Sequence, residues 1–170
     1  ASFSQPIKIT KDQFNIWIKL LKSSPSANLW LLDSNNLYKK NLWLHAKLNG
    51  IEKNRIKFAP KVSIEEHINR HQIIDLFLDT YPYNAHTSTS DAIWAECPVL
   101  TLAGQSFASR VAGSILKEID CEELITNDSV EYYDKALDLY KSPKKLLRIK
   151  QKIIIGKKNS TLFKPNIFTT

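Results

Sequence analysis

The spacing of apolar residues predicts a chain that alternates between amphipathic helices and short strands. Between residues 11 and 22, apolar side chains recur at the spacing of one helix face: Phe14, Trp17, Ile18 and Leu21. The run Leu-Trp-Leu-Leu at 29–32 is continuously apolar, which is typical of a strand covered on both sides. The first part of the chain therefore predicts a helix followed by a buried strand.

The same unit recurs along the rest of the chain. We expect further strands at 55–58, 76–78 and 98–101. Further helices are expected at 36–48, 63–71, 87–95 and 106–117, and across 130–158 with a break at Ser142-Pro143. Short strands separated by helices predict an α/β fold with a doubly wound, parallel, Rossmann-like sheet. The first residues, Ala-Ser-Phe, resemble the end of a strand and have no helix–strand unit before them. We therefore expect one domain cut from a longer protein.

Composition places the chain among soluble globular proteins. Of its 170 residues, 43% are hydrophobic and 24% charged, which excludes the disordered and low-complexity classes. Its first five residues lack the basic start and apolar run of a signal peptide, and no apolar run reaches the roughly 18–20 residues that cross a bilayer. The two cysteines, Cys97 and Cys121, are too few for a disulfide scaffold. We expect a cytoplasmic protein that does not bind membranes.

The net charge of +7 is unevenly distributed. Residues 1–62 carry a net charge of +8, residues 63–140 of −10, and residues 141–170 of +9. We therefore divide the domain into an α/β core (1–140) and a basic C-terminal helix and tail (141–170). The basic residues are 20 Lys and 4 Arg at helical spacing, a pattern more typical of solvated helix faces than of a nucleic-acid site.

The candidate chemistry lies after the strands, because ligands of open parallel sheets bind beyond the carboxyl ends of the strands. The relevant segments are Ser4–Lys8, Ala59–His67 and Asp79–Asp91. The last segment opens a helix at Thr87-Ser88-Thr89, whose free backbone N–H groups and positive dipole end would attract an anion. The alternative is that these residues only cap the helix.

Single residues near these segments also have two interpretations. His86 could donate to a phosphate or bond only to the backbone, and Asp91 could accept from a ribose or simply favour a helix start. His67 and His71 have a spacing compatible with zinc, but no third ligand is evident, so we expect no metal. Cys97, before Pro98, is expected to be a buried core residue rather than a nucleophile.

Five motifs resemble the C-terminal catalytic lobe of O-GlcNAc transferases. The residue sequence of the motif around His86 is especially similar to the bacterial members. The matching stretches are Phe3-Ser4-Gln5-x-x-Lys8-Ile9, Asn54-Arg55-Ile56-x-Phe58-x-Pro60, Glu65-Glu66-His67-x-x-Arg70, Leu78-Asp79-Thr80-x-Pro82-x-Asn84-x-His86-Thr87-Ser88-x-x-Asp91 and Ala108-Ser109-Arg110-Val111-Ala112. The resemblance implies one lobe of a glycosyltransferase B fold. It also implies that the N-terminal catalytic lobe, which in this family supplies a histidine near the reaction centre, and the tetratricopeptide repeats are absent from these residues.

The resemblance implies a role for each matching residue. Gln5 and Lys8 would contact the diphosphate of a UDP-sugar, and Lys8 would stabilise the leaving group. His86, Thr87 and Ser88 would bind the phosphates, and Asp91 the ribose. His67 would stack on the uracil, with Arg70 at its edge and the Val62 backbone reading the base. Ile64 departs from the animal members, which have a lysine that contacts the ribose at this position.

We therefore expect the donor-binding lobe of an inverting, metal-independent transferase. It would move GlcNAc or another hexose from a UDP-sugar to a Ser/Thr hydroxyl of an acceptor protein, without a cofactor, and this part alone is expected to be inactive. Relatives that use GDP-fucose, or that glucosylate Asn, leave the sugar open. The alternative is a non-catalytic nucleotide- or anion-binding module that acts through its basic C-terminal segment.

Overall fold

The computed structural model describes residues 1–164 of the chain, so the end of the predicted tail, residues 165–170, lies outside the described residues. The helices are α1 (Lys11–Ser23), α2 (Asn36–Leu48), α3 (Ile64–Gln72), α4 (Thr87–Trp94), α5 (Val111–Glu118), α6 (Ser129–Lys141) and α7 (Pro143–Asn159). The strands are β1 (Leu29–Leu32), β2 (Ile56–Ala59), β3 (Phe77–Leu78), β4 (Val99–Leu102) and β5 (Ile125–Thr126). Within residues 1–164, no helix has both the length and the hydropathy that crossing a membrane requires.

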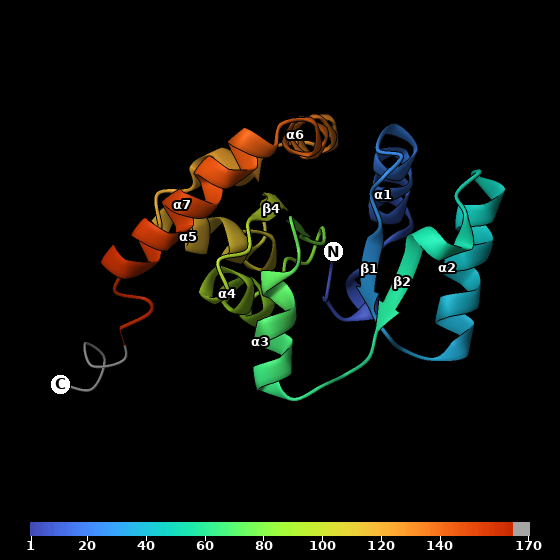
Figure 1. The fold of residues 1–170 in the computed structure, drawn as a ribbon, viewed down its shortest axis with the longest axis horizontal. Helices are drawn as coiled ribbons and strands as arrows, with labels where there is room; N and C mark the ends of the chain where they lie inside the picture. Colours follow the sequence, from blue (N-terminus) through green and yellow to red (C-terminus); the bar gives the residue numbers. More distant parts are fainter. Residues whose placement is uncertain (165–170) are drawn as a thin grey trace.

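All strand pairs are parallel, and the N-terminal segment joins two ladders. β1 pairs with β2, and β4 lies between β3 and β5. The Ser2 N–H donates to the Trp30 carbonyl at 2.8 Å, and the Leu78 N–H donates to the Ala1 carbonyl at 2.7 Å. Ala1 and Ser2 thus hold a strand position between β1 and β3. Figure 1 marks the N-terminus between β1 and the part of the domain that contains β4. The order β2, β1, N-terminal segment, β3, β4, β5 is that of a doubly wound sheet, as predicted.

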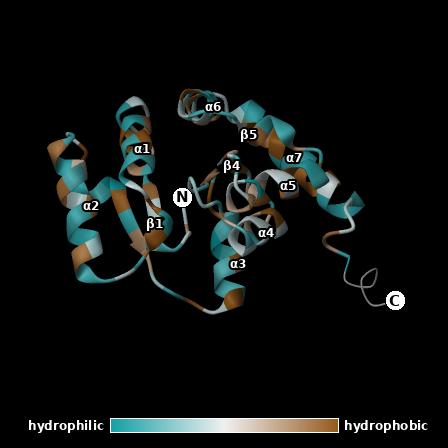
Figure 2. Ribbon diagram, turned by 180° about the vertical axis from the view of Figure 1, so that it is seen from behind, coloured by the Kyte–Doolittle hydropathy of each residue, from teal (hydrophilic) through white to brown (hydrophobic). Residues whose placement is uncertain are grey.

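Continuously apolar strands fit this sheet because each of its faces carries a core. Val99 of β4 belongs to a core cluster with residues of α4, α5 and α7, whereas its neighbour Leu100 belongs to a second cluster with residues of α1 and α6. Trp17 of α1 and Tyr132 of α6 are both fully buried, and the Trp17 indole N–H donates to the Tyr132 hydroxyl at 3.3 Å. In Figure 2, β1 is largely hydrophobic whereas the helices carry both kinds of residue.

Four helices start with a side-chain cap. Thr10, Asn35, Ser63 and Asp128 each accept a backbone N–H of the following helix through a side-chain oxygen. At Ser63 the Glu66 carboxylate also accepts the Ser63 N–H, which completes a capping box.

Two expected features differ in the structure. The helix predicted over 106–117 is interrupted, because Phe107–Ser109 forms a 3₁₀ turn capped by Ser106, and α5 starts only after Arg110. β5 was not predicted, since its two residues are too few to show an alternating pattern.

The basic helix α7 packs closely against the rest of the domain. Ile149 and Ile153 are buried, and a Cβ atom at Gly156 would collide with the Ile119 carbonyl. Three lysines of α7 form ion pairs with acidic residues: Lys145 with Asp138, Lys152 with Glu123, and Lys157 with Glu96. Part of the positive charge at the C-terminus is therefore balanced within the domain.

Candidate functional site

The carboxyl edge of the sheet gathers the loops that the sequence singled out. Residues 4–10 follow the N-terminal strand, residues 60–63 follow β2, and residues 79–86 follow β3. The strand order reverses between the N-terminal segment and β3, so loops 4–10 and 79–86 flank the place where ligands of such sheets bind.

Loop 79–86 is held by the carboxylate of Asp79, which is completely buried at the end of β3. Asp79 Oδ1 accepts the backbone N–H groups of Thr80 at 2.7 Å and Ala85 at 2.6 Å, and Asp79 Oδ2 accepts the Thr101 hydroxyl at 2.6 Å. Burial raises the pKa of Asp79 to about 7, and the three donors oppose this shift. One carboxylate thus fixes both ends of the loop to β4.

A second set of bonds fixes the middle of the loop. The Thr80 hydroxyl donates to the Tyr83 carbonyl at 2.7 Å, and the Asn84 amide group donates to the Thr80 carbonyl at 2.9 Å. The Asn84 N–H donates to the Ala108 carbonyl at 2.9 Å, which joins this loop to residues 103–110. The two loops approach closely at Gly104, where a Cβ would lie 3.0 Å from the Tyr81 ring of the first loop and would overlap Ser109 within its own loop.

Lys8 and His86 meet over this fixed loop. The Lys8 ammonium donates to the Asn84 carbonyl at 3.0 Å and lies 4.2 Å from the centre of the Tyr83 ring. The His86 ring stacks on Tyr83 with centroids 5.1 Å apart, and its Nε2 donates to Ala108 O at 3.4 Å. Burial lowers the pKa of Lys8, and the charge of Asp79 opposes that change. The predicted phosphate contacts Lys8 and His86 are therefore neighbours.

The start of α4 has free donors. Its N-cap residue, His86, makes no side-chain capping bond, and the Thr89 hydroxyl instead donates to Ala85 O at 2.8 Å. Within residues 1–164, the backbone N–H groups of Thr87 and Ser88 have no hydrogen-bond acceptor. Residues 87–91 therefore supply no side-chain cap at the N-cap position, and the anion site stays a prediction. The N–H groups and the positive end of the helix dipole remain available for an anion.

Helices α3 and α4 bring together the three residues predicted at the nucleoside. His67 Nε2 lies 3.6 Å from Asp91 Oδ2, and a nitrogen of the Arg70 guanidinium contacts His67 Nδ1. Burial raises the pKa of Asp91; burial and then the charge of Arg70 lower the pKa of His67. Val62 is 39% exposed on the preceding loop.

Other candidates are less engaged. Gln5 is exposed, and its carbonyl accepts the Lys8 N–H at 2.9 Å. His71 is buried, and its Nδ1 donates to the His67 carbonyl at 2.7 Å. Among the described residues, no group of three His, Cys, Asp or Glu side chains could hold a metal. Cys97 is buried, as predicted, and burial raises the pKa of its thiol to about 11.

The sequence analysis missed the part that Asp79 plays, although its signal was present. An acidic residue directly after a buried strand, followed by Thr80, has to be paired with donors because an unpaired buried charge is costly. Asp79 was seen only as the end of a strand and as part of a family motif.

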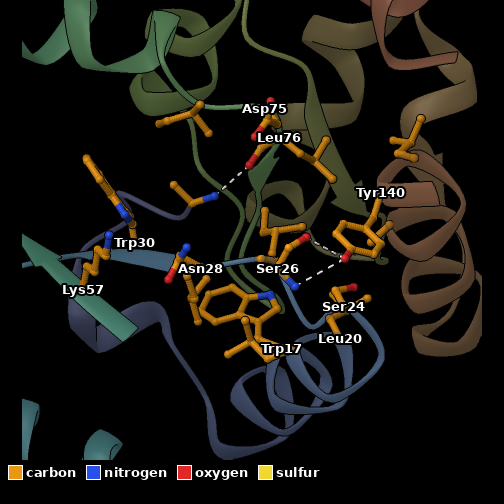
Figure 3. Close-up of a pocket in the computed structure, with 18 of the residues that line it drawn as sticks. Trp17, Leu20, Ser24, Ser26, Asn28, Trp30, Lys57, Asp75, Leu76 and Tyr140 are labelled. Atoms are coloured by element: carbon orange, nitrogen blue, oxygen red, sulfur yellow. Dashed lines mark hydrogen bonds between the residues drawn. The ribbon is translucent and has the colours of Figure 1, made fainter. Parts of the chain in front are cut away.

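A large cavity lies at the opposite edge of the sheet. It has a volume of about 430 Å³ and lies between α1 and β1 on one side and the segments around Leu76 and Tyr140 on the other (Figure 3). Its polar lining includes Asp75, Lys57 and a Ser26–Tyr140 hydrogen bond of 2.8 Å. None of the predicted site residues lines it.

Comparison with known proteins decides the family. The sequence profile of glycosyl transferase family 41 matches residues 1–170, the whole chain. The chain belongs to glycosyl transferase family 41. It is 33% identical over 163 residues to a UDP-N-acetylglucosamine–peptide N-acetylglucosaminyltransferase of Caenorhabditis elegans, with 96% of this chain matched to 14% of that protein. A probable enzyme of the same name from Arabidopsis thaliana is 31% identical over 164 residues, across 96% of this chain and 17% of its own length.

A solved structure of this family confirms the fold. The chain superposes on an O-GlcNAc transferase mutant from Thermobaculum terrenum with a TM-score of 0.88 and 25% identity, over 93% of this chain and 31% of that one. The expected Rossmann-like lobe of a glycosyltransferase B fold is therefore confirmed, as is the resemblance to O-GlcNAc transferases. The chain spans less than a fifth of the length of its two family 41 relatives named above.

We expect Asp79→Asn to loosen loop 79–86, because the amide places a donor or a weaker acceptor against groups that already donate. The free energy of unfolding should fall by about 1–3 kcal/mol, the usual cost of a disrupted buried hydrogen bond. Urea denaturation measures this change. Asp75→Asn, at the exposed opposite end of the same strand, is the matched control and should stay within about 0.5 kcal/mol. Equal effects of both substitutions would contradict the role of Asp79.

Proposed function

We propose that this chain is the donor-binding lobe of an inverting, metal-independent protein glycosyltransferase. Its substrate would be UDP-GlcNAc or a related nucleotide sugar, and its acceptor a Ser/Thr hydroxyl of a protein. The observation that carries the proposal is the uncapped start of α4 beside Lys8 and His86, since an ammonium, an imidazole and free N–H groups surround one position. The names of the family relatives support the choice of donor.

In the proposed complex the diphosphate would lie over the N-terminus of α4. The N–H groups of Thr87 and Ser88 would donate to phosphate oxygens, and His86 would donate from the side. Lys8 would lie beside the bridging oxygen, with Gln5 on the same loop. These groups replace the metal ion that many nucleotide-sugar enzymes use to neutralise a diphosphate. The nucleoside would extend towards α3, with Asp91 at the ribose and His67, Arg70 and Val62 at the base.

The chemical step follows from this placement. The acceptor oxygen would attack the anomeric carbon from the face opposite UDP and lose its hydroxyl proton to a base outside this lobe or to water, while the bond from that carbon to the β-phosphate oxygen breaks. The electron pair stays on UDP, and the charge that builds on the leaving oxygen is stabilised by Lys8 and the start of α4. The acceptor would be held by the N-terminal lobe, so two lobes together would align the reacting atoms.

The alternative function, anion binding through the basic C-terminal segment, receives less support. Lys145, Lys152 and Lys157 of α7 are engaged in ion pairs within the domain. A nucleic-acid site would keep such cations available for phosphates.

Isothermal titration of the chain with UDP tests donor binding. We expect binding that is unchanged by Mg²⁺, that is stronger for UDP than for GDP or UMP, and that falls at least tenfold in Lys8→Ala and in His86→Ala. Lys57→Ala, which removes a lysine at the cavity on the opposite edge, should leave the affinity unchanged. Binding that requires Mg²⁺, or that is lost equally in Lys57→Ala, would contradict the proposal.

Lys8 is predicted to act mainly in the transition state, because negative charge grows on UDP as the glycosidic bond breaks. In the longer protein that contains both lobes, Lys8→Ala should lower kcat by at least a hundredfold, a larger factor than the loss of UDP affinity. Steady-state kinetics and UDP titration of the same variant give the two factors. Equal factors would show that Lys8 serves binding alone.

A further inference from the structure

Arg70 is held in one orientation by contacts on three sides. Its Nη1 donates to the Pro60 carbonyl at 2.8 Å, and its guanidinium carbon lies 4.1 Å from the centre of the Phe3 ring. Its Nη2 contacts Nδ1 of His67, one helical turn earlier on α3. Arg70 thus points at His67 as well as towards the position expected for the base.

This contact determines which nitrogen of His67 carries the proton. A guanidinium has donors and no acceptor, so Nδ1 of His67 has to accept. The ring is then neutral, with its proton on Nε2. The titratable and charged groups that face it are Arg70 and His71 of α3 and Asp91 of α4. Burial lowers the pKa of His71 to about 4, so His71 is neutral as well.

The state of His67 affects the carboxylate opposite it. His67 Nε2 is 3.6 Å from Asp91 Oδ2, which is longer than a hydrogen bond but within reach of an ion pair. Nε2 carries a proton in both states of the ring, so protonation adds a positive charge opposite Asp91. A charged His67 would attract Asp91 more strongly and compete for the carboxylate that the proposed function assigns to the ribose. The charge of Arg70 opposes that protonation, as does the partial burial of the ring.

We propose that Arg70 is a positioning residue, which holds His67 as a neutral ring protonated on Nε2 and so keeps Asp91 free for the ribose of the nucleotide. The role of the ribose rests on the proposed function, whereas the state of His67 does not. Arg70 therefore does more than contact the edge of the base, the role that the family resemblance implies.

The first test reads the ring of His67 directly and needs no nucleotide. Long-range ¹H–¹⁵N spectra of the chain should show the neutral Nε2–H form of His67, with a titration midpoint below the ordinary value for histidine. Arg70→Met keeps the length of the side chain and removes its donors and charge, so the titration midpoint should rise, although the burial that also lowers the pKa of His67 remains in the variant. Arg70→Lys, which restores the charge, should return the midpoint towards the lower value. Lys61→Met removes an exposed charge from the neighbouring loop and should change nothing.

The second test measures UDP affinity at pH 8 and pH 6. The ratio of the affinity at pH 8 to that at pH 6 should be larger for Arg70→Met than for the unmodified chain, because His67 becomes protonated at a higher pH in the variant. UDP itself also titrates between pH 6 and pH 8, but its effect is the same for both proteins. It therefore cancels when the pH 8 to pH 6 affinity ratio of the variant is divided by that of the unmodified chain. In the double variant with His67→Gln, the additional pH dependence should disappear because the titrating ring is gone.

The outcomes separate the two proposals. A His67 ring protonated on Nδ1, or one that titrates at the same pH with and without Arg70, would overturn the positioning role. An unchanged affinity ratio despite a shifted midpoint would overturn the link to Asp91. Absence of UDP binding in the unmodified chain would overturn the proposed function and leave the state of the His67 ring to the first test.

Discussion

A single buried carboxylate organises the carboxyl edge of this domain. Asp79 ends β3 and accepts three hydrogen bonds, from the two ends of loop 79–86 and from Thr101 of the adjacent strand. This closes the loop against the sheet, so Asn84 can hold the Lys8 ammonium and His86 begins α4. The site depends on this constraint because short strands alone would leave the loop free to move.

The same carboxylate shapes the charge of the site. Partial burial lowers the pKa of Lys8, whereas the negative charge of Asp79 acts in the opposite direction. The acid beneath the loop therefore helps to keep Lys8 protonated, and a cation is what a departing diphosphate requires. On the nucleoside side the effect is opposite, because the neighbouring charge is positive: Arg70 keeps His67 neutral beside Asp91. In both halves of the site, a charged residue thus sets the protonation state of a neighbouring residue that faces the ligand.

Much of this arrangement could be predicted from sequence, because the relevant signals are local. Apolar runs such as Leu29–Leu32, and caps such as Ser63, act over a few residues, and the parallel order of the strands follows from their connections. Three features required the structure. β5 is too short to show a period, Arg110 interrupts a helix pattern for reasons of loop packing, and the partners of Asp79 lie up to 22 residues away. The cavity of about 430 Å³ lies at the edge opposite the predicted site residues. A search for the binding site by cavity size would therefore select a different edge of the sheet from a search by residue chemistry.

The central claim is that UDP binds over the start of α4, at the carboxyl edge of the sheet. Titrating UDP into ¹⁵N-labelled chain and following the backbone amides tests it most directly. The account predicts the largest shifts at Thr87 and Ser88, with further shifts at Lys8 and Val62. Shifts concentrated at Ser26, Leu76 and Tyr140, around the large cavity, would contradict it.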